Sequence, residues 1–168
     1  DRPDGRADFD AGHIPGARYV DLDAQLARHG DSGDGRHPLP PVEQLQGHAR
    51  GWGIDRGDTV VVYDDLKNLS AARAWLLLRY AGVADVRLLD GGLAAWRGAG
   101  LPIETGETPP PAAGNVTLAY GALPTLTIDE AAAFPAAGVL LDARAGERYR
   151  GEVEPIDPRA GHIPGAVS

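Results

Sequence analysis

Short apolar runs alternate with segments of helical periodicity along the first hundred residues. Residues 59–63 form a continuous, mostly β-branched run without polar alternation. This pattern predicts a strand covered on both faces, as in a parallel sheet. Residues 86–89 predict a second short buried strand, and residues 18–22 predict another short strand.

Helical patterns lie between and after these runs. Apolar residues recur every three or four positions over 42–52 and predict an amphipathic helix that ends near Gly53. Ser70 is placed to cap a helix over 71–81, and a short helix is expected over 93–100. Strands that alternate with helices indicate an α/β fold with a covered sheet.

The second part of the chain opens with a proline-rich segment. Residues 105–115 contain three consecutive prolines and predict an extended, fairly stiff linker. Thr127 and Glu130 match a capping box, which predicts a helix that continues to Phe134. Residues 139–142 predict a buried strand, followed by a charged loop.

One hexapeptide occurs twice. Gly-His-Ile-Pro-Gly-Ala stands at 12–17 and again at 161–166, which is 149 positions later (161 − 12). This distance fits two copies of a domain-sized unit and is too long for a solenoid repeat. We therefore expect one nearly whole unit and the opening of a second, in a sequence that is an excerpt of a longer protein.

The amino-acid composition limits the classes of function that the chain can have. With 43% hydrophobic residues the chain can bury a core, and its net charge of −8 disfavours nucleic acid or an anionic membrane as the main partner. No apolar run reaches the length of a membrane span and no targeting segment is visible, so a cytoplasmic location is expected. The absence of cysteine excludes thiol chemistry within these residues.

The repeated hexapeptide and two further stretches carry a family resemblance. Residues 60–65 lead into 70–75, and residues 86–96 lead to 100–104. In this order they resemble the two-domain rhodanese family of thiosulfate and 3-mercaptopyruvate sulfurtransferases. The resemblance implies tandem α/β units, each with a mainly parallel five-stranded sheet and helices on both faces, of which the second is truncated in this sequence.

The resemblance also implies a domain organisation. A non-catalytic N-terminal domain is expected over 1–104, the linker over 105–115, and the beginning of the catalytic C-terminal domain over 116–168. The strand at 139–142 precedes the second hexapeptide. Its counterpart before the first hexapeptide would lie upstream of Asp1, so the first strand of the N-terminal domain is expected to be missing.

In this family the catalytic cysteine stands in a tight loop between a strand and a helix. The resemblance places Asp64 at that position, and a carboxylate cannot form a persulfide. We expect the first unit to be catalytically silent and the active cysteine to lie beyond residue 168. A residual anion site or general-base role for Asp64 is the alternative.

Arginines gather before the second hexapeptide. By the resemblance, Arg148 and Arg159 would bind the anionic sulfur donor, since a guanidinium suits a carboxylate or thiosulfonate oxygen pair. The alternative is solvated loop charge that pairs with neighbouring acidic side chains. The residues concerned are Arg144, Arg148, Arg150 and Arg159, with Glu147, Glu152 and Glu154.

His13 and His162 occupy the same place in the two hexapeptides. We expect each imidazole to bond nearby backbone and lock its turn. Metal binding is the alternative, but no second His or Cys lies at a workable spacing. The resemblance implies neither a metal nor an organic cofactor.

The implied reaction of the intact family is transfer of sulfane sulfur from thiosulfate or 3-mercaptopyruvate to cyanide or another thiophilic acceptor. The donor preference stays open. One alternative is an inactive rhodanese-homology module with a structural or binding role. Another is a phosphatase, which would need a cysteine and a longer phosphate-binding loop than residues 64–69 provide.

Overall fold

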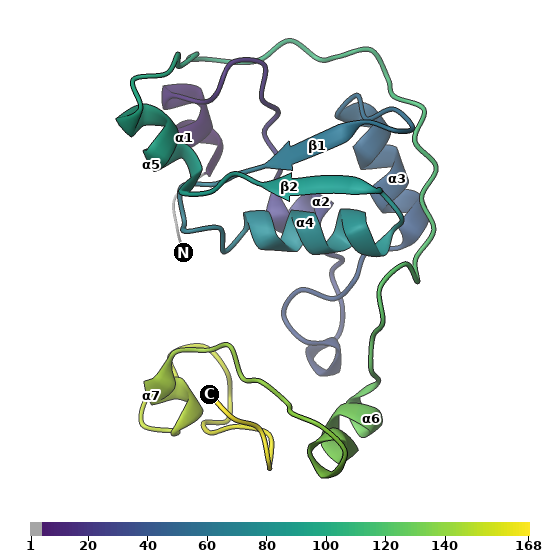
Figure 1. Cartoon of the computed structure of the whole chain (residues 1–168), viewed down its shortest axis with the longest axis vertical. Helices are drawn as coiled ribbons and strands as arrows, with labels where there is room; N and C mark the ends of the chain where they lie inside the picture. Colours follow the sequence, from purple (N-terminus) through teal and green to yellow (C-terminus); the bar gives the residue numbers. More distant parts are fainter. Residues whose placement is uncertain (1–4) are drawn as a thin grey trace. The chain divides into compact units, whose positions relative to one another are not determined.

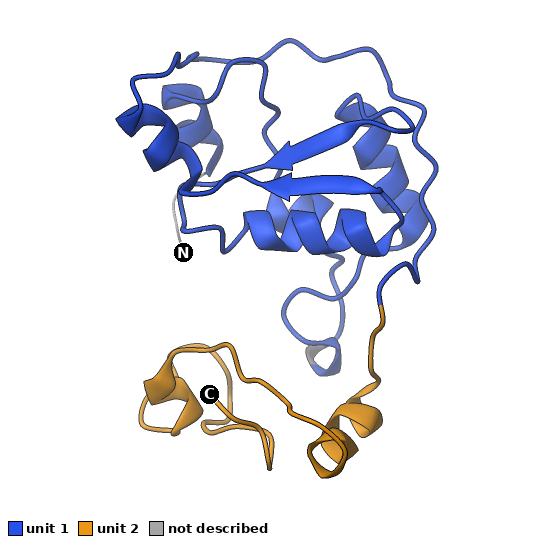
Figure 2. Cartoon of the chain, viewed as in Figure 1, with its two compact units in different colours: residues 1–123 blue, residues 124–168 orange. Residues whose placement is uncertain are grey.

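The structure is a computed structural model that describes residues 5–168 of the chain. Packing divides the chain into two compact units (Figure 2). The first unit extends to Leu123, and the second runs from Pro124 to Ser168.

The first unit alternates helices with two strands (Figure 1). Its strands are β1 (Thr59–Val62) and β2 (Asp85–Leu88). Its helices are α1 (Gly5–Ala11), α2 (Leu22–Gln25), α3 (Val42–Gly51), α4 (Ala71–Tyr80) and α5 (Gly92–Gly98), with a 3₁₀ turn η1 at Ser32–Asp34.

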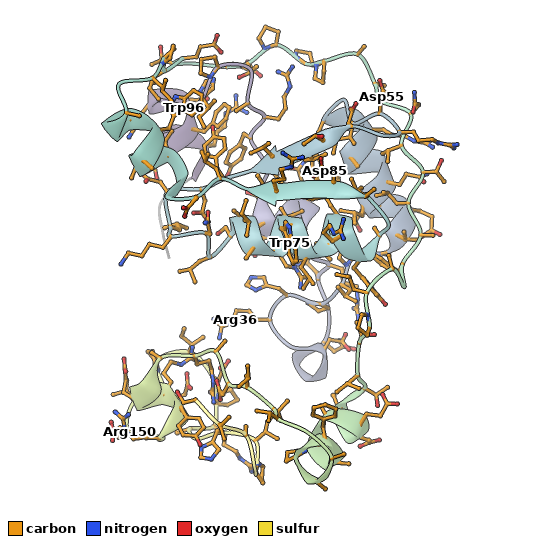
Figure 3. All side chains as sticks on the ribbon, viewed as in Figure 1. Arg36, Asp55, Trp75, Asp85, Trp96 and Arg150 are labelled. Carbon is orange, nitrogen blue, oxygen red and sulfur yellow. The ribbon has the colours of Figure 1, made fainter. Side chains whose placement is uncertain are left out.

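Strands β1 and β2 pair in parallel, in register from Thr59 opposite Asp85 to Val62 opposite Leu88. Helix α4 makes the crossover between them and packs against both strands (Figure 1). The side chain of Trp75 points from α4 to the sheet, where its Nε1 donates to the Val86 carbonyl at 2.9 Å (Figure 3). The parallel α/β arrangement expected from the sequence is confirmed.

The core of the first unit lies around α3 and α4. Leu45, Leu77 and Leu78 are almost completely buried. They belong to the apolar faces that the helical periodicity predicts. The buried cluster consists of Leu26, Leu45, Ala49, Ile54, Ala74, Leu77, Leu78, Ala81, Val83, Val86, Val116 and Leu118.

The sheet is smaller than the family resemblance implies. The described residues form a two-stranded sheet rather than a five-stranded one. The prediction that residues 59–63 are covered on both faces is wrong for this chain. Val61 is 55% exposed, whereas Val60 and Val62 pack against the core. The reason is that α4 covers one face of β1, and the alternate side chains point away from it.

The short strand expected over 18–22 is also absent. Residues 18–21 are irregular and α2 begins at Leu22. The Asp21 carboxylate accepts a hydrogen bond from the amide of Ala24 at 2.8 Å, which caps this helix. A local cap therefore outweighs the β-propensity of Tyr19 and Val20, which find no strand to pair with among the described residues.

The proline-rich segment follows the surface of the first unit as irregular chain. At its end, the amide of Val116 donates to the Ile54 carbonyl at 3.2 Å, and the amide of Ala119 donates to Ala81 at 3.1 Å. Val116 and Leu118 are 6% exposed and belong to the core. By packing, residues up to Leu123 thus belong to the first unit, whereas the domain limits expected from the family resemblance stay a prediction.

The second unit consists of α6 (Ile128–Ala133), the 3₁₀ turn η2 (Phe134–Ala136) and α7 (Gly146–Tyr149). The capping box of Thr127 and Glu130 is formed as expected. The buried strand predicted over 139–142 is not formed. Leu141 makes one isolated parallel bridge with Val167 and is 73% exposed, because a single bridge covers neither of its faces.

The two hexapeptides share their local geometry. The amide of the final Ala donates to the Ile carbonyl across each Pro-Gly turn, at 3.0 Å in the first copy and 2.9 Å in the second. The Gly after Pro has φ of 76° and 81°, the left-handed region that a type II turn requires. The repeat in the sequence is thus a repeat in structure.

Candidate functional site

The loop from Asp64 to Ser70 follows β1 and precedes α4. It lies at the carboxyl end of a parallel strand and at the amino end of a ten-residue helix. Ligands of open α/β sheets bind at such edges, and backbone N–H groups at helix starts attract anions. The loop therefore has the surroundings of an anion-binding site.

That anion position is filled by the carboxylate of Asp64. Oδ1 accepts hydrogen bonds from the amides of Leu66 and Asn68, both at 2.8 Å. Oδ2 accepts from Ser70 at 2.8 Å and from Ala71 at 2.9 Å. Four backbone donors thus converge on one side chain, which binds the start of α4 to the end of β1.

This arrangement corrects the predicted helix cap. Ser70 has helical backbone angles and makes no side-chain capping bond. The Asp64 carboxylate, six residues earlier, takes that role. Sequence reasoning assigns a cap to the nearest Ser or Thr, and it misses one that reaches across a loop.

The ionised form of Asp64 is favoured. Partial burial acts to raise the pKa of Asp64, but hydrogen bonds from the amides of Ala71, Leu66, Asn68 and Ser70 outweigh it. The pKa of this carboxyl group is therefore below its ordinary value. A general base needs a pKa near the working pH, so this environment does not favour that role.

The loop backbone is strained where it directs its amides inward. Lys67 and Asn68 have φ of 58° and 65°, in the left-handed region that non-glycine residues rarely adopt. From the start of α5, the amide of Leu93 donates to the Asp64 carbonyl at 3.0 Å. An open hollow of about 430 Å³ lies beside this loop, lined by Asp64, Asp65, Lys67, Asn68, Asp90, Gly91 and Ala94.

In the second unit, Arg148 lies in the first turn after Ala145 and pairs with acidic side chains. Its Nε and Nη2 lie 3.2 and 2.7 Å from the two carboxylate oxygens of Glu154. Nη2 also lies 2.8 Å from Asp157. The Arg148 side chain is 18% exposed and that of Glu154 is 5% exposed.

Arg144 joins the same cluster. Its guanidinium donates to both oxygens of Asp142 and, at 2.6 Å, to the Gly161 carbonyl of the second hexapeptide. Its Nη1 lies 3.5 Å from Glu154. The hydrogen bond from the Arg144 side chain is the main cause that lowers the pKa of Asp142 to about 2. That from Arg148 is the main cause that lowers the pKa of Glu154 to about 2.

Arg159 is exposed. With Arg144 it lines an open hollow of about 540 Å³ between residues 140–144 and the second hexapeptide. Arg148 does not line this hollow. Arg150 pairs with Glu152 on the exposed side of the loop, at 2.7 and 2.9 Å.

Both histidines lock their turns. His13 Nδ1 lies 2.8 Å from the Phe9 carbonyl, and His162 Nδ1 lies 2.8 Å from the Tyr149 carbonyl. Because a carbonyl only accepts, Nδ1 donates in both. Each imidazole stacks on its aromatic partner with ring centroids 3.9 Å apart. Within residues 5–168, no cluster of three or more His, Asp or Glu side chains could hold a metal ion.

Sequence reasoning left Glu154 and Asp142 without a role of their own. The sequence did contain a sign of these ion pairs, since both acidic residues lie within a few positions of the arginines that they bind. Their burial, which distinguishes them from the exposed Glu152, depends on how the loop folds back on itself.

In the part of the chain that the structure describes, no helix is long and apolar enough to cross a membrane.

Comparison with known proteins gives this fold and these loops a family. The Rhodanese-like domain profile matches residues 2–99. SseB of Mycobacterium tuberculosis, named for thiosulfate sulfurtransferase activity, is 51% identical over all of this chain and 60% of its own length. A Pseudomonas aeruginosa protein named for 3-mercaptopyruvate sulfurtransferase activity is 46% identical over 94% of this chain and 57% of its own.

A solved structure supports the same relation. The crystal structure of SseA from Escherichia coli, described as a 3-mercaptopyruvate sulfotransferase with the rhodanese fold, superposes with a TM-score of 0.83 at 32% identity. It covers 97% of this chain and 61% of its own. The chain belongs to the rhodanese-like family. It spans about 60% of the length of the relatives that it matches.

Proposed function

We propose that the intact protein is a sulfurtransferase that moves sulfane sulfur from thiosulfate or 3-mercaptopyruvate to a thiophilic acceptor such as cyanide. The observation that carries this proposal is the similarity of the whole chain to relatives that are named for these two activities. Such names favour an enzyme over an inactive binding module. We also propose the cytoplasm as its location.

The proposed reaction passes through a persulfide on a cysteine beyond residue 168. The thiolate attacks the outer sulfur of thiosulfate, the S–S bond breaks, and sulfite leaves with the bonding electron pair. With 3-mercaptopyruvate, the thiolate attacks the donor sulfur, the C–S bond breaks, and its electron pair leaves with the enolate of pyruvate, which takes up a proton to give pyruvate. The acceptor then attacks the outer sulfur of the persulfide, takes it as thiocyanate in the case of cyanide, and releases the cysteine thiolate.

Within this chain, residues 1–104 are proposed to form the catalytically silent N-terminal domain. The four amides that converge in its loop already donate to Asp64, so an incoming anion would have to compete with that carboxylate for them. Carboxylate oxygens are too hard to accept sulfane sulfur. The segment 105–115 is proposed as the linker and 116–168 as the beginning of the catalytic domain.

Arg148 and Arg159 are proposed to bind the anionic part of the donor. Support comes from the chemistry of the guanidinium group and from the place of these residues next to the second hexapeptide. Arg148 is held firmly by Glu154, and Arg159 is exposed beside the hollow near His162.

Steady-state kinetics of the intact protein test the proposal. Thiocyanate formation from cyanide is measured with each donor, and a mass increase of one sulfur atom on the enzyme is sought after donor is added alone. Arg148→Ala is expected to raise the donor KM roughly 10- to 100-fold, because one charge-assisted contact is lost. No turnover with either donor would contradict the sulfurtransferase assignment, and an unchanged KM would contradict the role of Arg148.

A further inference from the structure

The buried carboxylate of Glu154 contacts two arginines and two backbone amides. Oε1 accepts from Arg148 Nη2 at 2.7 Å and from the amides of Ile156 and Asp157 at 3.1 and 3.0 Å. Oε2 lies 3.2 Å from Arg148 Nε and 3.5 Å from Arg144 Nη1. A carboxylate that is 5% exposed needs such partners, because an unpaired buried charge is strongly destabilising.

These contacts orient Arg148. Glu154 engages the Nε–Nη2 edge of the guanidinium group in a bidentate pair. Asp157 approaches Nη2 from the more exposed side, and none of the contacts between Arg148 and the described residues uses Nη1. Nη2 thus donates to both Glu154 and Asp157, so a second pair of anionic oxygens can bind the Nη1–Nη2 edge only in exchange for the half-exposed Asp157 carboxylate.

The orientation of Glu154 is fixed from both sides. The amides of Ile156 and Asp157 bind it from the turn that follows, so its position depends on the local backbone. Arg144 connects it to the Gly161 carbonyl in the second hexapeptide and to the Asp142 carboxylate. A rigid set of contacts therefore runs from the repeated turn to the inner edge of Arg148.

From this geometry we propose that Glu154 is a positioning residue for donor binding: it clamps the inner edge of Arg148, so that the anionic oxygens of the donor bind the outer edge in exchange for the Asp157 carboxylate. The proposal rests on the function proposed above for Arg148. Glu154 acts through the arginine and does not contact the donor. Its effect should therefore appear in the donor KM and should depend on the presence of Arg148.

A double-mutant cycle in the intact protein tests this role. Glu154→Gln keeps the size of the side chain and removes the charge. It is expected to raise the KM for thiosulfate and 3-mercaptopyruvate about tenfold, with kcat changed less than about twofold. In the Arg148→Ala background the same substitution should change KM less than about twofold. The matched control is Glu152→Gln, since Glu152 pairs with Arg150 on the exposed side of the same loop.

If Glu154→Gln does not fold, as judged by thermal unfolding, Glu154→Asp takes its place as the test variant. Its carboxylate keeps the charge but is shorter by one methylene, so a smaller rise in KM is expected, again only when Arg148 is present. An unchanged KM in the Glu154 variants, or the same rise with and without Arg148, would overturn the positioning role. An unchanged KM in Arg148→Ala would instead contradict the function proposed for Arg148.

Discussion

Asp64 shows how one residue type changes the chemistry of a loop while the fold of the loop is kept. Its carboxylate accepts four backbone hydrogen bonds at 2.8–2.9 Å, from positions on both sides of a tight turn. These bonds offset the strain of the left-handed backbone at Lys67 and Asn68. Asp64, which we propose to stand in place of a nucleophile, therefore has a structural role of its own.

Replacement of Asp64 by Ala is expected to destabilise the first unit by about 2–3 kcal/mol, because a helix cap and charge-assisted hydrogen bonds are lost together. Urea unfolding of the 168-residue chain measures the change. All three tryptophans, at positions 52, 75 and 96, lie in the first unit, so their fluorescence reports on it alone. Asp65→Ala, at an exposed neighbour, is the control and should change stability by less than about 0.5 kcal/mol.

The contribution of Asp64 should also depend on pH. Its pKa is lowered in the folded state, so its stabilising effect is fully present above the unfolded pKa and is lost as pH falls through the folded value. The stability difference between the native chain and Asp64→Ala is expected to be constant above about pH 5. It should shrink below the ordinary value of 3.8. A difference that stays the same down to pH 2 would exclude the ionised cap.

At the scale of elements, the contact between α5 and the loop after β1 depends on a glycine. A Cβ built on Gly92 would lie 2.5 Å from the Asp64 carbonyl oxygen, and this residue has φ of 57°. Its neighbour Gly91 has φ of 73°, so the chain enters α5 through two left-handed residues. Only glycine allows this backbone to approach so closely.

Gly92→Ala is therefore expected to destabilise the first unit by about 2–4 kcal/mol, through backbone strain and the clash with the carbonyl. Gly98→Ala at the end of α5 is the matched control, since a Cβ added at Gly98 would meet no atom within 4 Å and the φ of this residue is negative. That substitution should leave stability unchanged or raise it by up to about 1 kcal/mol. Equal effects at both positions, measured by tryptophan fluorescence in urea, would show that the close approach is unimportant.

The sequence predicted the elements that depend on contacts between residues close in sequence, and it did not predict those that depend on distant partners. Helices α3 and α4 follow local periodicity, and α6 follows its capping box; all three appear within about two residues of their predicted limits. The segments at 18–22 and 139–142 have strand-like composition, but a strand forms only where a partner pairs with it along several residues.

For the candidate site, too, the sequence predicted some features, and others depend on the folded structure. The position of Asp64 follows from the order of motifs along the chain, whereas its four amide donors depend on the path of the loop backbone. The pairing of Arg148 with Glu154 was open as an alternative, but the burial that distinguishes this pair from Arg150 and Glu152 follows from the folded loop. The pattern of charged residues in the sequence does not show which of these side chains are buried.

At the scale of the whole molecule, the two units carry unequal shares of the proposed function. The first has its own buried core and a loop in which four amides already donate to Asp64. The second contains the arginine cluster and the repeated turn, but several of its large apolar side chains are exposed, among them Ile128 at 84% and Leu141 at 73%. Neither contains a thiol, so the chemistry proposed for the intact protein requires a cysteine outside these 168 residues.

The purified 168-residue chain is accordingly expected to form no thiocyanate from thiosulfate and cyanide above the uncatalysed rate. Only a thiolate or a comparably soft nucleophile can take up and release sulfane sulfur, and Asp64 offers oxygen atoms that already accept four hydrogen bonds. The intact protein, assayed beside it at equal concentration, supplies the positive control. Activity that rises in proportion to the concentration of the cysteine-free chain would overturn the interpretation of Asp64 as a silent replacement.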